Sequence, residues 1–113
     1  MTSLNIGAGE DETGDVKFDI VRAKDPDVQG TATHLPFNDE SFDTIIMDQV
    51  LEHISPEDLE LVFEEIYRVL EDGGVLKARV PHAGTRLSDQ DPTHRSTWTY
   101  ETPEYFSNGN FSW

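Results

Sequence analysis

The sequence predicts an α/β fold, an open sheet of parallel strands joined by turns and at least one helix. Short apolar segments alternate with turns rich in glycine, proline and acidic residues, and a long amphipathic segment separates the last two. The turn Gly7-Ala8-Gly9 follows the first apolar segment, Asp19 ends the second, and a polar loop follows the fourth. Because the carboxyl ends of parallel strands meet at one edge of the sheet, this order predicts a nucleoside pocket there.

Five segments have the apolar character of strands. They span residues 3–6, 15–21, 27–32, 44–47 and 74–80. The fourth, from Thr44 to Met47, is a continuous apolar run, which predicts a central parallel strand that is covered on both faces. Pro81 ends the fifth strand, since proline cannot donate a hydrogen bond to a neighbouring strand.

One long helix is predicted to begin after Ser55. Ser55 can cap the helix, Pro56 suits the first helical position, and Asp58 completes a spacing like that of a capping box. Apolar residues then recur at helical spacing and predict one buried stripe. They are Leu59, Val62, Phe63, Ile66, Val69 and Leu70. The pair Gly73-Gly74 is predicted to end the helix.

The character of the chain changes after residue 82. Residues 1–82 form the predicted α/β core, whereas residues 83–113 combine prolines, glycines and aromatic residues without a sustained period. This segment predicts an ordered, aromatic-rich loop or tail with at most one short helix near residues 102–106. The fifth strand is then a bare edge unless the tail or another chain covers it. We therefore expect self-association or a partner chain.

The composition limits the class of protein. With 113 residues there is room for one hydrophobic core. The absence of cysteine excludes disulfides and thiolate metal sites. No apolar run approaches the roughly 20 residues of a membrane-spanning helix, and the N-terminus lacks a signal pattern, so we expect no membrane association and a cytoplasmic protein.

Acidic residues dominate the charge of the chain. It has 23 Asp and Glu against 8 Lys and Arg, a formal net charge of -15. Such a surface repels phosphate backbones, so we expect no nucleic-acid partner bound through the chain's own surface. The acids are scattered along the chain, which favours a halophilic protein whose self-repulsion is screened by salt. An ordinary acidic domain is the alternative.

Three short motifs follow the glycine turn: Leu35-Pro36-Phe37, Ser41-Phe42-Asp43 and Leu51-Glu52-His53. In this order they resemble the class I S-adenosylmethionine-dependent methyltransferases. The resemblance covers residues 3–82 well and residues 83–106 loosely. It implies a minimal Rossmann-like open parallel sheet in the order 3-2-1-4-5, without the family's final strands and N-terminal helices. It also implies S-adenosylmethionine as the cofactor and methyl transfer to an unknown small-molecule or protein acceptor.

The resemblance assigns the cofactor to the first half of the chain. Glycines in the turn let the backbone approach the methionine portion, and Asp19 is placed to accept hydrogen bonds from the ribose hydroxyls. Thr31 stands where the family has an acid for the adenine amino group, so adenine recognition falls to backbone groups near Ala32. The predicted cofactor-binding residues are Asn5, Gly7, Gly9, Asp19, Ile20, Thr31, Ala32 and Asp48.

Histidines dominate the predicted acceptor side. His53, His82 and His94 are expected to line one cleft at the carboxyl ends of the strands. His53 and His94 are the candidate general bases, since imidazole titrates near neutral pH; a structural or surface role is the alternative for each. The resemblance places Asp91, His94 and Arg95 on the acceptor side. The predicted substrate-pocket residues are His82, which is expected in the cleft, Asp91 and Arg95. No compact spacing such as His-x-x-x-His occurs, so no metal site is predicted.

Two other functions remain compatible with the sequence. The first is a non-catalytic, methyltransferase-like remnant that acts as a binding or assembly subunit. The second is a half-enzyme that a partner chain completes. Binding of S-adenosylmethionine or S-adenosylhomocysteine separates the first of these from an enzyme.

Overall fold

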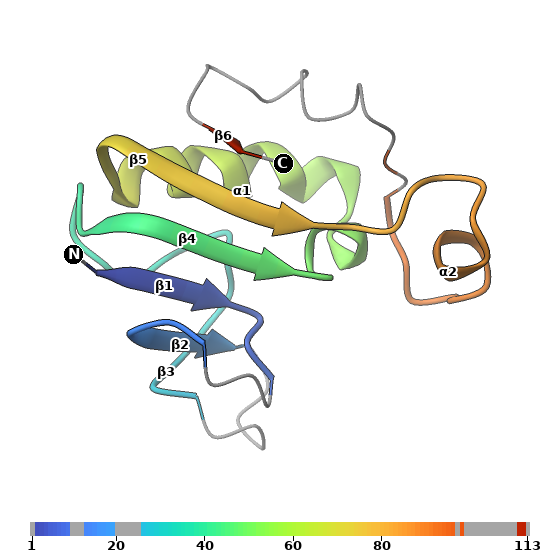
Figure 1. The fold of residues 1–113 in the computed structure, drawn as a ribbon, viewed down its shortest axis with the longest axis horizontal. Helices are drawn as coiled ribbons and strands as arrows, with labels where there is room; N and C mark the ends of the chain where they lie inside the picture. The colour runs from blue at the N-terminus through green and yellow to red at the C-terminus, as the bar shows by residue number, and fades with distance from the viewer. Residues whose placement is uncertain (1, 10–12, 20–25, 97, 99–110, 113) are drawn as a thin grey trace.

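The computed structural model describes residues 2–9, 13–19, 26–96, 98 and 111–112. It contains a six-stranded sheet in the order β3-β2-β1-β4-β5-β6, in which every pair of neighbours is parallel (Figure 1). The strands are β1 (Ser3–Ile6), β2 (Val16–Asp19), β3 (Val28–Gln29), β4 (Phe42–Asp48), β5 (Leu70–Arg79) and β6 (Phe111–Ser112). The predicted Rossmann-like order 3-2-1-4-5 is confirmed, and β6 extends it by one short strand.

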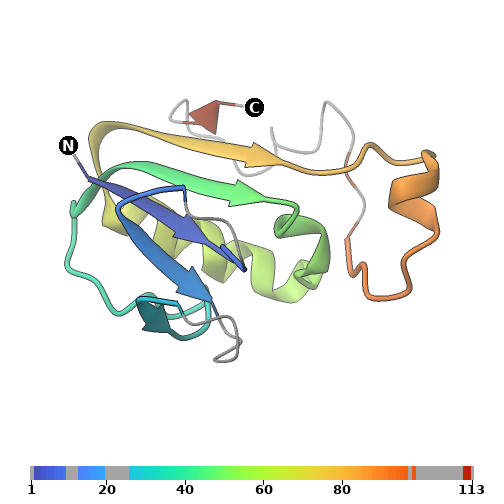
Figure 2. The same ribbon diagram turned by 60° about the horizontal axis from the view of Figure 1, so that its bottom comes forward.

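The helix α1 (Pro56–Val69) lies along one face of the sheet (Figure 2). It begins at Pro56 as predicted, with Ser55 in extended conformation at the N-cap. The predicted capping box is wrong in one detail. The Ser55 hydroxyl donates to the carboxylate of Asp58 at 3.2 Å and makes no cap hydrogen bond to the backbone.

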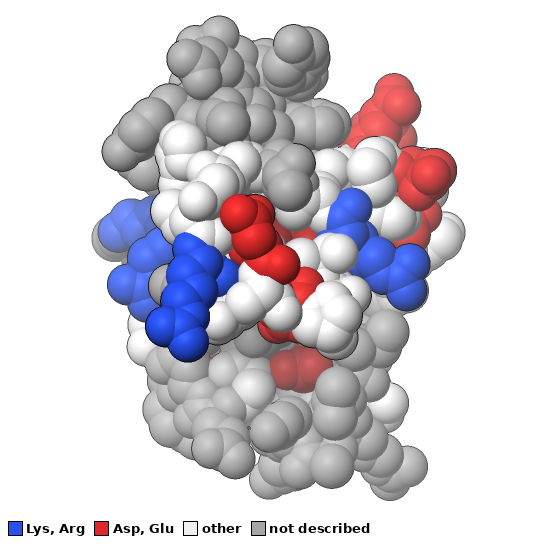
Figure 3. Space-filling model, turned by 90° about the vertical axis from the view of Figure 1, so that its right-hand side faces the viewer, with Lys and Arg blue, Asp and Glu red and all other residues white. Residues whose placement is uncertain are grey.

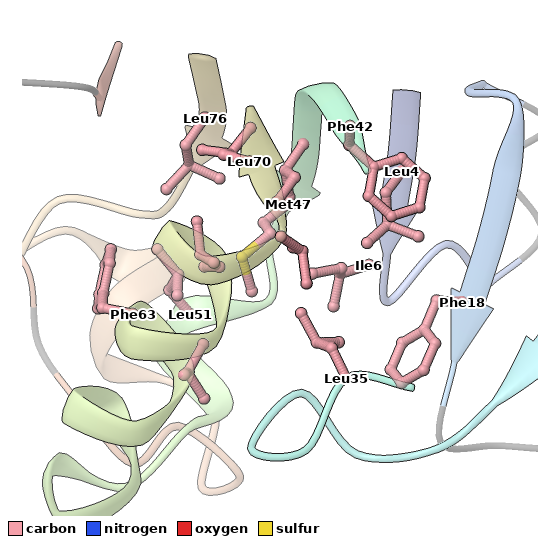
Figure 4. Close-up of a cluster of buried hydrophobic side chains, with 14 of the residues drawn as sticks. Leu4, Ile6, Phe18, Leu35, Phe42, Met47, Leu51, Phe63, Leu70 and Leu76 are labelled. Carbon is pink, nitrogen blue, oxygen red and sulfur yellow. The ribbon is translucent and has the colours of Figure 1, made fainter. Parts of the chain in front are cut away.

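The hydrophobic core lies between α1 and the sheet (Figure 4). The strands contribute side chains that are at most 2% exposed, among them Leu4, Met47 and Leu76. The helix contributes the predicted stripe as far as Val69. Burying each such side chain stabilises the fold by roughly 1.5–3 kcal/mol, so this layer holds the strands in register.

The prediction that β4 is covered on both faces is not met within the described residues. Ile45 and Met47 are fully buried beneath α1, whereas Thr44 and Ile46, on the opposite face, are only half-buried. In the described part of the chain, α1 is the one helix that lies along the sheet (Figures 1 and 2). An apolar run therefore does not by itself show that both faces are covered.

The helix ends earlier than predicted. It stops at Val69, and β5 begins at Leu70 without an intervening loop. Phe42 of β4 lies opposite Leu70, but Thr44 lies opposite Val75, so the extra residues of β5 form a bulge in this interval. A Cβ on Gly74 would lie 2.9 Å from the Glu71 carbonyl oxygen, which explains why the bulge requires glycine there.

The tail is more regular than predicted. It contains the short helix α2 (Arg86–Asp89) and the strand β6, which pairs with Leu76 and Lys77 of β5 and covers part of that edge. The helix predicted near residues 102–106 lies outside the described residues. Trp98 is 1% exposed and packs against Phe63 of α1, with ring centroids 6.5 Å apart. None of the helices in the described residues has the length and apolar character needed to cross a membrane.

Candidate functional site

A pocket of about 460 Å³ opens at the carboxyl ends of β1 and β2. Its walls come from the ends of these strands, from residues 30–33 after β3, from the loop after β4, and from the start of α1. The strand order reverses between β1 and β4, which is where open α/β sheets bind ligands. Its volume falls within the range of small-molecule sites, roughly 300–1,000 Å³.

The glycine turn forms the floor of this pocket. The Gly7 amide donates to the Phe18 carbonyl oxygen at 2.7 Å, and Gly7 has a φ of 71°. A Cβ on Gly7 would lie 2.5 Å from a methyl carbon of Val50, so the loop after β4 packs directly on this glycine. Gly9 has a φ of 56°, but no atom lies within 4 Å of the place a Cβ would take. The two glycines are therefore required for different reasons.

Asp19 connects the turn to the second strand. Its carboxylate accepts a hydrogen bond from the Gly9 amide at 2.8 Å, and the residue is 8% exposed. Its carbonyl oxygen accepts from the Gly30 amide at 3.1 Å. Asp19 lines the pocket, and its two hydrogen bonds hold the ends of β1, β2 and β3 together.

Residues after β3 form the side wall. Thr31 and Ala32 line the pocket, in agreement with their predicted position. The hydroxyls of Thr31 and Thr33 lie 3.0 Å apart, and Thr33 also contacts a ring nitrogen of His34 at 3.0 Å. Thr31 therefore offers a hydroxyl that already belongs to a local hydrogen-bond network.

The opposite end of the pocket is built around a short 3-10 helix, η2 (Leu51–His53). The loop of residues 91–96 lies against this helix. The amides of Arg95 and Ser96 both donate to the Glu52 carbonyl oxygen, at 2.6 and 3.1 Å. These bonds bring Arg95 into the wall beside His53, although the two residues are far apart in the sequence.

The fold brings His53 and His94 together. Their ring centroids are 4.8 Å apart and the rings meet edge to face. His94 donates from Nδ1 to the Ser88 carbonyl oxygen at 2.9 Å, and its Nε2 lies 3.4 Å from Oδ2 of Asp91. His53 lines the pocket, whereas His94 contacts the His53 ring and is not among the lining residues.

Glu52 is a site residue that the sequence analysis did not single out. It is 2% exposed, and its Oε1 has no hydrogen-bond partner within the described residues. Burial raises the pKa of this carboxyl, and the backbone hydrogen bond together with His53 and His94 partly oppose that rise. The signal in the sequence was its position between Leu51 and His53, but an acid in such a loop is usually exposed.

Several predicted cofactor residues do not line the pocket within the described residues. Asn5 is 1% exposed, and its amide donates to the Thr13 carbonyl oxygen at 3.0 Å. Gly9 touches the site through Asp19. Asp48 forms a two-bond ion pair with Arg79, at 2.9 and 2.8 Å. Ile20 lies outside the described residues.

Two predicted substrate residues also lie away from the pocket in the described part of the chain. His82 is exposed, and its Nδ1 donates to the Ala83 carbonyl oxygen at 2.8 Å. Asp91 accepts hydrogen bonds from the Thr93 hydroxyl and amide, which lower the pKa of its carboxyl. The structure thus brings His53, His94, Asp91 and Arg95 to one end and leaves His82 outside.

The face of the molecule toward which the strands point carries both basic and acidic side chains. Figure 3 shows Lys and Arg side chains on both sides of a strip that holds acidic and uncharged residues. The large net negative charge is thus not uniform on the face around the pocket.

A family model for the methyltransferase domain matches residues 8–78, which is more than half of the chain. The chain belongs to the methyltransferase domain family. The matched region begins at Ala8, inside the glycine turn, and contains Gly9, Asp19, η2 and α1. The resemblance drawn from the sequence is thereby confirmed, and membership supports S-adenosylmethionine as the cofactor.

Solved structures show the same fold. An S-adenosylmethionine-dependent methyltransferase of Thermotoga maritima superposes with a TM-score of 0.76 at 22% identity, over 93% of this chain and 60% of that one. A second, from Archaeoglobus fulgidus, gives 0.75 at 21% identity, over 92% of this chain and 57% of that one. The cyclase SpnF gives 0.66 at 20% identity, over 92% and 48%. This chain therefore spans about half to three-fifths of these proteins. No curated protein matches it.

Proposed function

We propose that this chain binds S-adenosylmethionine and takes part in methyl transfer to a small-molecule or protein acceptor. The observation that carries the proposal is the pocket at the strand reversal, with a buried acid, Asp19, at one end and His53 at the other. Family membership supplies the reaction class. The fold alone does not, since SpnF, a cyclase, shares it.

The residues present fit this cofactor. Asp19 offers a buried carboxylate to ribose hydroxyls, and the backbone of residues 30–33 borders the space for a base. S-adenosylmethionine, when bound, supplies an electrophilic methyl group on a sulfonium. The chain's contribution is then to orient the two reactants and to exclude water between them.

His53 is the better placed of the two candidate proton acceptors, because it lines the pocket and His94 does not. The Thr93 hydroxyl donates to Asp91 at 2.7 Å, so its oxygen accepts from Nδ1 of His53 at 3.2 Å. A neutral ring with the proton on Nδ1 has its lone pair on Nε2. His53 can thus take a proton from an acceptor at Nε2.

Titration calorimetry with S-adenosylhomocysteine tests the proposal. Binding by the intact chain should raise the melting temperature by mass action. We expect weak binding, since Thr31 stands where the resemblance places an acid for the adenine amino group. If millimolar S-adenosylhomocysteine gives no heat and no thermal shift, the chain is a non-catalytic binding or assembly subunit or one half of an enzyme.

We also propose that the chain self-associates or binds a partner chain. β6 pairs with Leu76 and Lys77, and within the described residues no other strand pairs with that edge of β5, which supports pairing with another chain. Light scattering that gives a monomer at all concentrations would contradict this. The acidic composition further supports a halophilic protein of a high-salt cytoplasm.

A further inference from the structure

Three ligand-bearing side chains converge beside the pocket. Glu52 and His53 come from η2, and His94 comes from the loop that packs against it. Each offers one potential ligand atom, and these atoms all lie within 4.8 Å of one another. The sequence predicted no metal site because it contains no compact ligand spacing. The fold supplies the proximity that the sequence lacks.

In both imidazoles, hydrogen bonds fix Nδ1 as the protonated nitrogen. The Ser88 carbonyl oxygen can only accept, so Nδ1 of His94 carries the proton in their 2.9 Å contact. Nδ1 of His53 likewise donates, because the Thr93 oxygens that it contacts at 3.2 and 3.4 Å both act as acceptors. In neutral rings both Nε2 atoms then carry lone pairs. Such fixing of a ring through its other nitrogen is typical of histidines that bind metals.

Glu52 gives an independent indication of a missing cation. It is 2% exposed, and its Oε1 is buried without a hydrogen-bond partner among the described residues. A buried carboxylate in this state is destabilising unless it is paired or coordinates a metal. Oδ2 of Asp91 also lies 3.4 Å from Nε2 of His94, so a carboxylate borders the cluster.

We propose that Glu52, His53 and His94 bind one divalent transition-metal ion. Two imidazoles and one carboxylate form the ligand set of many zinc sites and of mononuclear iron sites, and imidazole disfavours Mg²⁺ and Ca²⁺. Through His53 the ion borders the cofactor pocket. When the ion is bound, the His53 ring is a ligand, so the proton-accepting role proposed for His53 belongs to the metal-free chain. The binding itself does not depend on methyl transfer.

The test uses the full chain, stripped with EDTA and dialysed, in KCl that keeps it folded and without cofactor. Zn²⁺ is titrated by calorimetry, and Co²⁺ is followed by its visible absorption. We expect one ion per chain and a Co²⁺ band typical of mixed nitrogen and oxygen ligands. Glu52→Gln and His94→Ala should each weaken Zn²⁺ binding at least tenfold, since even residues that only support a ligand typically change affinity 10–100-fold.

His82→Ala is the matched control, because His82 is an exposed histidine outside the cluster. It should bind Zn²⁺ as the unmodified chain does. Equal affinity of all four proteins would overturn the proposal and indicate non-specific binding to the acidic surface. No binding by the unmodified chain would also overturn it. Circular dichroism of each variant confirms that a loss of binding is not a loss of fold.

Discussion

The two ends of the pocket are built in different ways. At the β1–β2 end, hydrogen bonds join the glycine turn to β2. Their partners are close in the sequence; the Gly9 amide, for example, donates to the Asp19 carboxylate 10 residues later. At the η2 end, Glu52 and His53 meet Thr93, His94 and Arg95, which lie some forty residues farther along the chain. The first end depends on short chain connections, and the second depends on the docking of a distant loop.

This difference explains why sequence motifs predict the β1–β2 end of the pocket better than the η2 end. A glycine turn and an acid at the end of the next strand are fixed in space once the two strands pair. The η2 end exists only if residues 91–96 settle on η2, and closing such a long loop costs conformational entropy that its contacts must offset. We therefore expect substitutions at the two ends to have separable effects on cofactor binding and on the histidine cluster.

Gly7→Ala should have the largest effect. The new Cβ would lie 2.5 Å from a Val50 methyl carbon and would adopt a φ of 71°, so strain and overpacking together should destabilise the fold by about 2–5 kcal/mol. Chemical denaturation and calorimetry with S-adenosylhomocysteine measure this, and we expect binding to be lost. Gly9→Ala has open space and only the backbone cost, about 1–2 kcal/mol. Equal losses in both variants would show that the contact with Val50 is not the cause.

Asp19→Asn should weaken S-adenosylhomocysteine binding by about 10–150-fold, corresponding to roughly 1.5–3 kcal/mol for hydrogen bonds to a charged group. The amide keeps the shape of the carboxylate, and it can still accept from the Gly9 amide. Asp27→Asn is the control. Asp27 also accepts from a backbone amide, that of Lys17 at 2.9 Å, but is exposed and outside the pocket. Zn²⁺ binding at the other end should be unchanged in both; a joint loss would show that the two ends are not separable.

Glu65→Gln tests how much the hydrogen bonds of Glu65 stabilise the fold, measured as a function of pH. Glu65 accepts from Arg68 Nε and from the Leu35 amide, both at 2.7 Å, and the bond from Arg68 chiefly lowers its pKa. The unfolded state thus binds the proton more readily, so the stabilisation is present above the ordinary pKa and is lost as pH falls through the lowered one. We expect Glu65→Gln to cost about 1–3 kcal/mol at pH 7 and less in acid, by denaturation at each pH. Glu64→Gln, a change at the exposed neighbouring residue, is the control and should cost little stability at pH 7.

Salt should have the smallest effect on stability, and this effect should not be confined to one end of the pocket. The net charge of -15 makes the folded chain repel itself, and molar KCl shortens the screening length from about 10 Å to about 3 Å. We expect the melting temperature to rise by several degrees from dilute to molar KCl. A flat or falling melting temperature would remove the halophilic interpretation. If salt raises the melting temperature of Gly7→Ala more than that of Gly9→Ala, the charge repulsion acts mainly at the β1–β2 end of the pocket.

The motifs of the sequence supplied the strand order through the family resemblance. The residues themselves predicted the start of α1 at Pro56 and a pocket beside Gly7 and Asp19. These last features follow from proline and glycine chemistry, from periodicity, and from the edge at which parallel strands end, all of which act over short stretches of chain. Asp19, Thr31 and Ala32 could therefore be placed without coordinates, whereas the linkage of Asn5 to Thr13 and of Asp48 to Arg79 could not.

Only the tertiary structure decided how the second half of the chain is arranged. The bulge in β5, the pairing of β6 and the burial of Trp98 each depend on which distant surface a segment meets. The same holds for Glu52, which is buried where the loop of residues 91–96 packs over η2 and whose Oε1 has no hydrogen-bond partner among the described residues. Residue type and spacing report local geometry, but burial and proximity arise only when the whole chain closes on its core.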